Sequence, residues 1–141
     1  MTVMTSSTTA VQTLAAEECW QLLATTSLGR VGWICPDGVD IVPVNFLARR
    51  HLIYFSSAPG SKLSEIVKNP RIAFEVDGVA HRQRWSVVVK GEATRLDSDV
   101  EIQESGVMAL HSFTPVEKWN YIRIDPYRVS GRRFTSARRS A

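Results

Sequence analysis

The sequence holds little that would build a membrane span, a disulfide framework or a metal site. No apolar run approaches the roughly 20 residues that a membrane-spanning helix needs. The only cysteines are Cys19 and Cys35, which we expect on a helix and a strand of a reduced, cytoplasmic protein. The histidines, His51, His81 and His111, are far apart and share no spacing, so no metal site is expected.

Motifs for nucleotide hydrolysis and for nucleophilic hydrolysis are also missing. Gly60-Ser61-Lys62 lacks the upstream glycine of a P-loop, which leaves nucleoside triphosphate hydrolysis without support. No G-x-S-x-G elbow occurs, and no Cys/His pair has a recognisable spacing. Hydrolase chemistry through a side-chain nucleophile is therefore not predicted.

Positive charge is concentrated at the C-terminal end. The net charge is +3, but residues 132–141 contain four arginines and no acid. Removing these four from 17 cationic residues leaves 13, against 14 acidic residues, so the rest of the chain is nearly neutral. A basic end can contact nucleic acid, but no nucleic-acid-binding motif accompanies it. A solvated tail is the favoured interpretation.

The length of 141 residues is typical of one domain with a real hydrophobic core. Residues 1–12 are rich in Ser and Thr and lack the charged and apolar regions of a signal peptide. We expect a disordered leader over residues 1–12, a folded domain over 13–134 and a basic disordered tail over 135–141.

Three apolar runs in the first half predict antiparallel strands, over residues 30–35, 41–47 and 51–57. Val, Ile, Phe and Tyr dominate these runs. Pro36-Asp37-Gly38 separates the first two with typical turn chemistry, and Ala48-Arg49-Arg50 is a polar break of hairpin length.

The remaining segments complete a mainly β protein. Alternating or strongly apolar patterns predict further strands at residues 71–77, 85–96, 119–125 and 127–134, with a polar loop at 78–84 and an interruption at Pro126. Helices are expected at 14–26, with Thr13 as N-cap, at 61–68, and near 100–111, with residues 97–99 as cap. Hairpin spacing favours an antiparallel sheet, and a small barrel with helices at its ends would remove exposed edges.

A candidate phosphate site follows the third predicted strand. It combines the hydroxyls of Ser56, Ser57 and Ser61 with the Lys62 ammonium at the start of a predicted helix. The alternative is an ordinary strand-turn-helix with Ser61 as N-cap and a solvated Lys62. Spacing alone leaves both readings open.

Pro43 lies inside the second predicted strand. Because proline cannot donate to a ladder, the strand must be an edge or be bulged there. A bulge would leave backbone groups near Val44 and Asn45 facing a ligand. A simple edge strand with a surface asparagine is the alternative.

Together these segments resemble the pyridoxamine 5'-phosphate oxidase-like family, the FMN-binding split barrels. The resemblance covers about residues 14–134. It rests on seven motifs in the family's order: GRVGW (29–33), DIVPVNF (40–46), IYFSS (53–57), PGSKL (59–63), NPRIAFEVD (69–77), WSVVVKGEATRL (85–96) and YIRIDPYRVSGRRF (121–134).

The resemblance implies a six-stranded antiparallel split β-barrel that forms a homodimer, with two FMN molecules at the dimer interface. It implies further that the cofactor contacts lie at Pro43, Val44, Asn45, Ser56, Ser57, Ser61, Lys62, Trp85 and Ser86. The C-terminal Arg-x-His segment that binds pyridoxal phosphate in true pyridoxamine phosphate oxidases does not occur among residues 121–141, where residues 131–140 read GRRFTSARRS.

Two classes of function remain after this resemblance. The first is an FMN-dependent oxidoreductase acting on an unidentified small-molecule substrate. The second is a flavin-binding carrier or sensor without turnover. Relatives that bind F420 or haem supply alternative cofactors. The catalytic residues, the substrate and the electron donor are not identified by the sequence.

Overall fold

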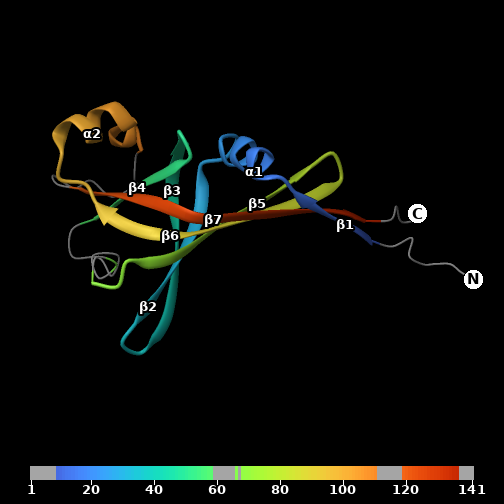
Figure 1. Ribbon diagram of the computed structural model, residues 1–141, viewed down its shortest axis with the longest axis horizontal. Helices are drawn as coiled ribbons and strands as arrows, with labels where there is room; N and C mark the ends of the chain where they lie inside the picture. The colour runs from blue at the N-terminus through green and yellow to red at the C-terminus, as the bar shows by residue number, and fades with distance from the viewer. Residues whose placement is uncertain (1–8, 59–65, 67, 111–118, 137–141) are drawn as a thin grey trace, which may run out of the picture.

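Strands form the framework of the molecule (Figure 1). The computed structural model describes residues 9–58, 66, 68–110 and 119–136. The strands are β1 (Thr9–Leu14), β2 (Leu28–Cys35), β3 (Gly38–Arg49), β4 (Leu52–Ser57), β5 (Arg71–Ala80), β6 (Gln83–Arg95) and β7 (Asn120–Ser136). The helices are α1 (Ala16–Leu23), α2 (Asp99–Ser105) and a 3₁₀ turn, η3 (Val107–Ala109).

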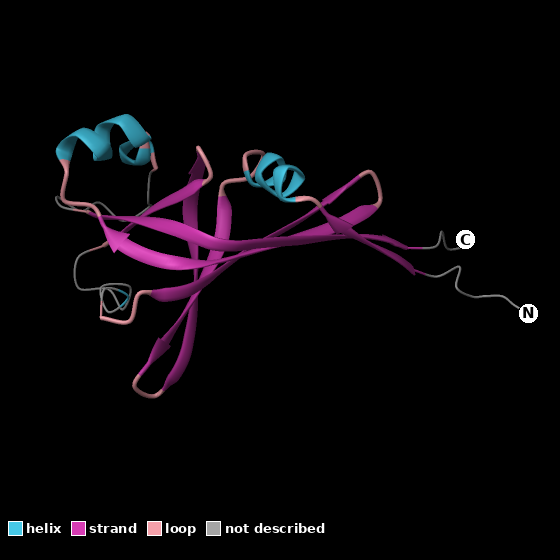
Figure 2. Ribbon diagram, viewed as in Figure 1, coloured by secondary structure: helices cyan, strands magenta, loops and turns pink. Residues whose placement is uncertain are grey.

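Six of the strands close into a ring. The order along the sheet is β1-β7-β4-β3-β2-β5-β6, and β6 pairs again with β7. All neighbours are antiparallel. β7 is long enough to serve two partners on one side, because residues 120–124 pair with β4 and residues 131–136 pair with β1. The expected mainly β, six-stranded split barrel is confirmed (Figure 2).

The barrel interior is filled by alternate residues of each strand. On β5, Ile72, Phe74 and Val76 are buried while their neighbours face outward, as the alternation predicted. Helix α1 adds Cys19 and Leu23, both fully buried, to the same core. Helix α1 and the sheet therefore share one hydrophobic core.

The hairpin turns differ from the predicted loops. The predicted loop over residues 78–84 is wrong, since β5 and β6 continue to a two-residue turn at His81-Arg82. The β3–β4 turn is Arg50-His51, because Arg49 still pairs with Leu52. All four turn residues have positive φ, between 52° and 64°, the geometry of tight turns that follow the strand twist.

The N-terminal segment forms a strand where a leader and a helix were predicted. Residues 9–12 lie in β1 and pair with the end of β7, so the expected leader and tail both overlap folded strands. The predicted N-cap at Thr13 is wrong because Thr13 is in this strand. Helix α1 starts at Ala16, after Ala15, without a side-chain cap, and Glu17 and Glu18 occupy its first turn.

The last strand and helix α2 complete the fold. Pro126 does not interrupt β7, because it pairs with Gly91 of β6, and a bulge at Tyr127 of β7 shifts the register between Lys90 and Gly91. Ser98 caps α2 by accepting a hydrogen bond from the Glu101 amide at 3.3 Å, as predicted. The predicted helix over residues 61–68 falls almost entirely outside the described residues. Within the described residues, no helix has the length and apolarity to cross a membrane.

Candidate functional site

The ladder between β3 and β4 is short, and we refer to the place where the two strands stop pairing as the opening between β3 and β4. β3 has 12 residues, but only Phe46–Arg49 pair with β4. Beyond the Phe46–Phe55 pair, the next residues on the two strands are Asn45 and Ser56. The structure therefore brings two predicted site segments, Pro43–Asn45 and Ser56-Ser57, to the two sides of one opening.

Pro43 lies on the part of β3 that has a single partner. Residues 38–45 pair with β2 in continuous register, and Pro43 is opposite Arg30. Of the two alternatives for Pro43, the structure selects the edge, since no bulge is present in this ladder. Pro43 and Asn45 are exposed, while Val44 points into the barrel and is buried.

The two serines at the end of β4 face opposite sides of the sheet. Ser56 is half-buried and paired with Tyr121, whereas Ser57 is 3% exposed and points inward. Within the part of the chain that the structure describes, the Ser57 hydroxyl has no hydrogen-bond partner. A buried, unsatisfied hydroxyl is costly and needs an explanation, which a bound ligand can supply. Ser61 and Lys62, predicted for the same site, lie outside the described residues.

Trp85 and Ser86 lie on β6, on opposite faces of the sheet. The Trp85 ring is buried and packs against Gly78, where an added Cβ would lie 2.7 Å from the ring. This side chain is therefore part of the core. Ser86 faces outward and lines a cavity of about 320 Å³ with Val88, Ser130, Gly131, Arg132 and Phe134.

Asn45 and Ser86 share the outer face of the sheet. Pro43, Arg30, Glu75 and Val88 form one row of paired residues across β3, β2, β5 and β6. Asn45 and Ser86 lie two residues farther along β3 and β6 on the same side of that row, three strands apart. Three spacings correspond to roughly 14 Å. Ser86 is thus outside the opening next to Asn45, but on the same surface.

Two polar residues beside Ser86 were not predicted. Ser130 and Arg132 lie on β7, and Arg132 is directly opposite Ser86. The alternating polar pattern of residues 128–132 indicated their outward direction. Their proximity to Ser86 could not be predicted, because it depends on the pairing of β7 with β6 that closes the barrel.

One arginine on this face serves two carboxylates. Arg30 Nη1 donates to Glu75 Oε1 at 2.6 Å, and Arg30 Nη2 is 3.8 Å from Asp77 Oδ1. Burial raises the pKa of the Glu75 carboxyl from 4.5, and nearby Asp77 raises it further, while Arg30 lowers it. Because Glu75 binds a proton more readily in the folded state, acid favours the fold at this position.

This shift predicts the effect of removing the carboxylate. The free energy of unfolding of the unmodified protein, minus that of Glu75→Gln, should increase as the pH falls from neutral through the raised pKa of Glu75. The difference should become constant below about 4.5, the ordinary pKa of a glutamate. Urea unfolding of both proteins at several pH values measures the difference. A constant difference, or one of opposite sign, would contradict the assignment.

Metal ligands do not converge in the described residues. No group of three or more His, Cys, Asp or Glu side chains there could hold a metal ion. His51 is in the β3–β4 turn, stacked on Trp20 with ring centroids 4.9 Å apart, and His81 is in the β5–β6 turn. His111 lies outside the described residues.

Comparisons with known proteins agree with this architecture. The sequence profile described as pyridoxamine 5'-phosphate oxidase matches residues 15–133. A Corynebacterium glutamicum protein named for the same family is 37% identical, with a TM-score of 0.79, covering 89% of this chain and 99% of that one.

Two similar structures are named as FAD-binding proteins. The Mycobacterium smegmatis protein is 32% identical, with a TM-score of 0.76, and the match covers 88% of this chain and 98% of that one. The Mesorhizobium loti protein is 28% identical, with a TM-score of 0.80, and the match covers 91% and 99%. With the profile match over residues 15–133, these structures place the chain in the pyridoxamine 5'-phosphate oxidase family.

Proposed function

We propose that this protein binds FMN at the opening between β3 and β4 and uses it as an oxidoreductase on a small-molecule substrate. One observation carries the proposal. The buried Ser57 hydroxyl, which has no hydrogen-bond partner among the described residues, lies near the end of the β3–β4 ladder, where Asn45 is the next residue of β3. The names of the two FAD-binding relatives support a flavin.

The residues of the opening suit the two polar parts of such a ligand. Ser56 and Ser57 offer hydroxyls to a phosphate, joined in the proposal by Ser61 and Lys62. The segment Pro43–Asn45, where β3 pairs with β2 but not with β4, is the part of the strand proposed to lie against a polar ring edge. A bound flavin supplies hydride-transfer chemistry, and the protein supplies its placement and electrostatic surroundings.

The absorption spectrum of the purified protein is the first test. A flavin spectrum supports the proposal, and chromatography of the extracted cofactor separates FMN from FAD and from F420. A Soret band would instead indicate haem. Around the opening, the described residues 43–46 and 55–58 include no His, Cys or Met to bind a haem iron. A protein that carries no cofactor and does not bind added FMN would refute the proposal.

A flavin-binding carrier or sensor without turnover is the second candidate. Residues 121–141 contain no Arg-x-His sequence of the kind that binds pyridoxal phosphate in the family's oxidases, which favours this candidate. Consumption of NADH or NADPH by the flavin-loaded protein distinguishes the candidates. Turnover well above that of free flavin supports an enzyme, and background consumption supports a carrier.

Replacing Ser57 by alanine should have opposite effects on the empty and the loaded protein. The empty protein should become more stable by about 1 kcal/mol, because a buried hydroxyl without a partner is removed. FMN binding should weaken about tenfold, since a charge-assisted hydrogen bond is lost.

Thermal unfolding without cofactor and fluorescence titration with FMN measure these two effects. Ser56→Ala is the matched control for stability, because Ser56 is half-buried and outward-facing. Unchanged FMN affinity in Ser57→Ala would place the phosphate elsewhere.

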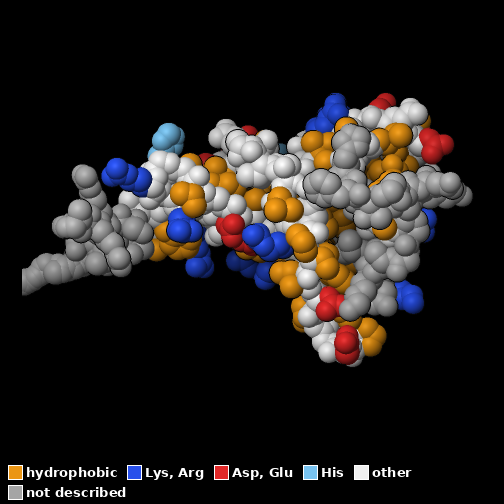
Figure 3. All heavy atoms as spheres, turned by 180° about the vertical axis from the view of Figure 1, so that it is seen from behind, with side chains coloured by type: hydrophobic (Ala, Val, Ile, Leu, Met, Phe, Trp, Pro, Cys, Tyr) orange, Lys and Arg blue, Asp and Glu red, His pale blue; other side chains and the backbone are white. Residues whose placement is uncertain are grey.

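We also propose a cytoplasmic homodimer. Cys19 and Cys35 are both free thiols, which suits a reducing compartment. The dimer proposal is supported by an apolar arm formed by β2 and β3, on which Ile34, Val39 and Ile41 are more than half exposed. Figure 3 shows hydrophobic side chains gathered along this projecting arm.

A further inference from the structure

A second cavity lies at the other end of β4, away from the proposed flavin site. It has a volume of about 290 Å³, within the lower range of small-ligand sites. Leu52 begins β4 at this cavity and Ser57 ends the strand at the opening, so the two sites are roughly 16 Å apart. The cavity is lined by Arg49, Arg50, Leu52, Tyr54, Ser98, Val100, Glu101, Glu104 and Ser105.

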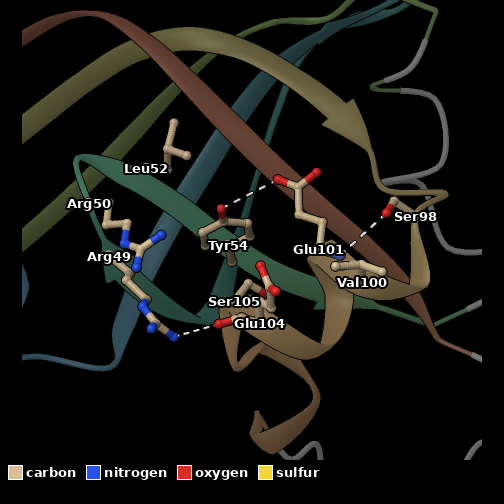
Figure 4. Close-up of a pocket in the computed structure, with 9 residues that line it drawn as sticks. All are labelled: Arg49, Arg50, Leu52, Tyr54, Ser98, Val100, Glu101, Glu104 and Ser105. Carbon is tan, nitrogen blue, oxygen red and sulfur yellow. Dashed lines mark hydrogen bonds between the residues drawn. The ribbon is translucent and has the colours of Figure 1, made fainter.

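The lining comes from two sides. Arg49 and Arg50, at the β3–β4 turn, lie on one side, and Ser98, Val100 and Glu101, from α2 and its cap, lie on the other (Figure 4). Two arginines and two glutamates give the lining no net charge. The two arginines lie together at the β3–β4 turn and form its positive side. The cavity therefore suits a dipolar ligand better than a simple anion or cation.

The positive side retains hydrogen-bonding capacity. Arg49 Nη1 donates to the main-chain oxygen of Glu104 at 2.5 Å, which holds the guanidinium at the end of α2. This leaves the other N–H groups of Arg49 for a ligand. Within the described ranges, Arg50 has no carboxylate partner. Two adjacent guanidinium groups are well suited to bind a carboxylate.

The two glutamates are not equivalent. Glu101 Oε2 accepts a hydrogen bond from Arg123 Nη1 at 2.6 Å, so its charge is already compensated. Glu104 makes no ion pair in the described part of the chain, because Arg49 contacts only its main-chain oxygen. Glu104 is therefore the negative group left to bind an ammonium.

The cavity floor adds a hydroxyl with a weak partner. Tyr54 is 6% exposed, and its Oη lies 3.5 Å from Glu101 Oε2, longer than an ordinary O–H···O hydrogen bond. Burial, followed by the Glu101 charge, raises the pKa of Tyr54, so its hydroxyl remains a donor. Leu52 and Val100 supply apolar walls between the charged groups.

We infer that this cavity binds a free amino acid with an apolar side chain. Its carboxylate would lie against Arg49 and Arg50 and its ammonium against Glu104, while Leu52 and Val100 contact the side chain. The volume and the presence of both charges in one lining suit a zwitterion of this size. The inference does not depend on the proposed flavin function.

The test is an NMR titration of the purified full-length protein with the twenty free amino acids. At least one with an apolar side chain should shift the amide signals of Leu52, Tyr54 and Val100, with half-saturation at about 1 mM or below. Its N-acetyl derivative lacks the ammonium, and its methyl ester lacks the carboxylate. Each should bind about tenfold more weakly than the parent.

Arg50→Gln and Glu104→Gln should each weaken binding about tenfold. Arg82→Gln is the matched control, because Arg82 also lies in a two-residue hairpin turn with positive φ and lines neither of the two cavities described. No shift at about 10 mM of any amino acid would overturn the inference. So would equal binding by all three variants, or a derivative that binds as tightly as its parent.

Discussion

Gly91→Ala is expected to destabilise the protein by about 3 kcal/mol, near the upper end of the range for overpacking in a core. A Cβ at this position would lie 2.5 Å from the main-chain oxygen of Asp125 and 2.9 Å from Cγ2 of Ile124. The first contact is with backbone, which cannot rotate away. The β6–β7 ladder would have to separate next to its bulge.

Gly32→Ala is the control for this prediction. Its added Cβ would lie 3.7 Å from the Asp40 oxygen and 3.9 Å from the Ala73 oxygen, which is ordinary contact. Alanine there should leave stability unchanged or raise it by about 0.5 kcal/mol, because the unfolded chain loses freedom. Thermal unfolding should show a fall of roughly 10 °C for Gly91→Ala alone. Equal effects in the two variants would show that the close approach at Gly91 is not needed.

The strands of the first half were predictable because each carries its own pattern. In β2, buried residues alternate with more exposed ones, β3 and β4 are rich in Val, Ile, Phe and Tyr, and Pro36-Asp37 supplies recognisable turn chemistry. The β5–β6 turn was missed for the opposite reason. His81 and Arg82 adopt positive φ, a geometry usually signalled by Gly or Asn, so the polar residues around them resembled a loop.

Long-range pairing explains the other differences. Residues 9–12 read Thr-Ala-Val-Gln, too short a segment to show a strand pattern, and the end of β7 is their pairing partner. Pro126 was expected to end a strand, but β6 continues alongside it, and the irregularity is a bulge at Tyr127 of β7. In both cases the partner strand is distant in the sequence, so the local pattern of residues does not reveal it.

The residues of the candidate site also fall into two groups: those whose position follows from local sequence and those whose position depends on long-range strand pairing. The proximity of Pro43–Asn45 to Ser56-Ser57 follows from one hairpin, which the sequence and the family resemblance both indicated. The position of Ser86 depends on the registers of three further strand pairs. The inward direction of Trp85 follows from its packing on Gly78, which no local pattern revealed.

Ile41→Glu is expected to dissociate the proposed dimer. Ile41 is 65% exposed on the half of β3 that lacks a β4 partner, and the arm around it is continuous with Pro43–Asn45. Exposed apolar surface beside an unpaired strand edge suits a second copy of the chain. A glutamate buried there without a partner would weaken association roughly 100- to 1,000-fold.

Sedimentation equilibrium of Ile41→Glu and of Val100→Glu measures this effect. Val100 is the matched control, since it is 62% exposed but lies on helix α2. The first variant should sediment as a monomer, and the second should remain a dimer. FMN titration of the same samples adds a second readout, because a cofactor shared between two copies should be lost together with the dimer. An Ile41→Glu protein that stays dimeric would place the interface elsewhere, and a monomer that still binds FMN tightly would show that one copy is sufficient for the site.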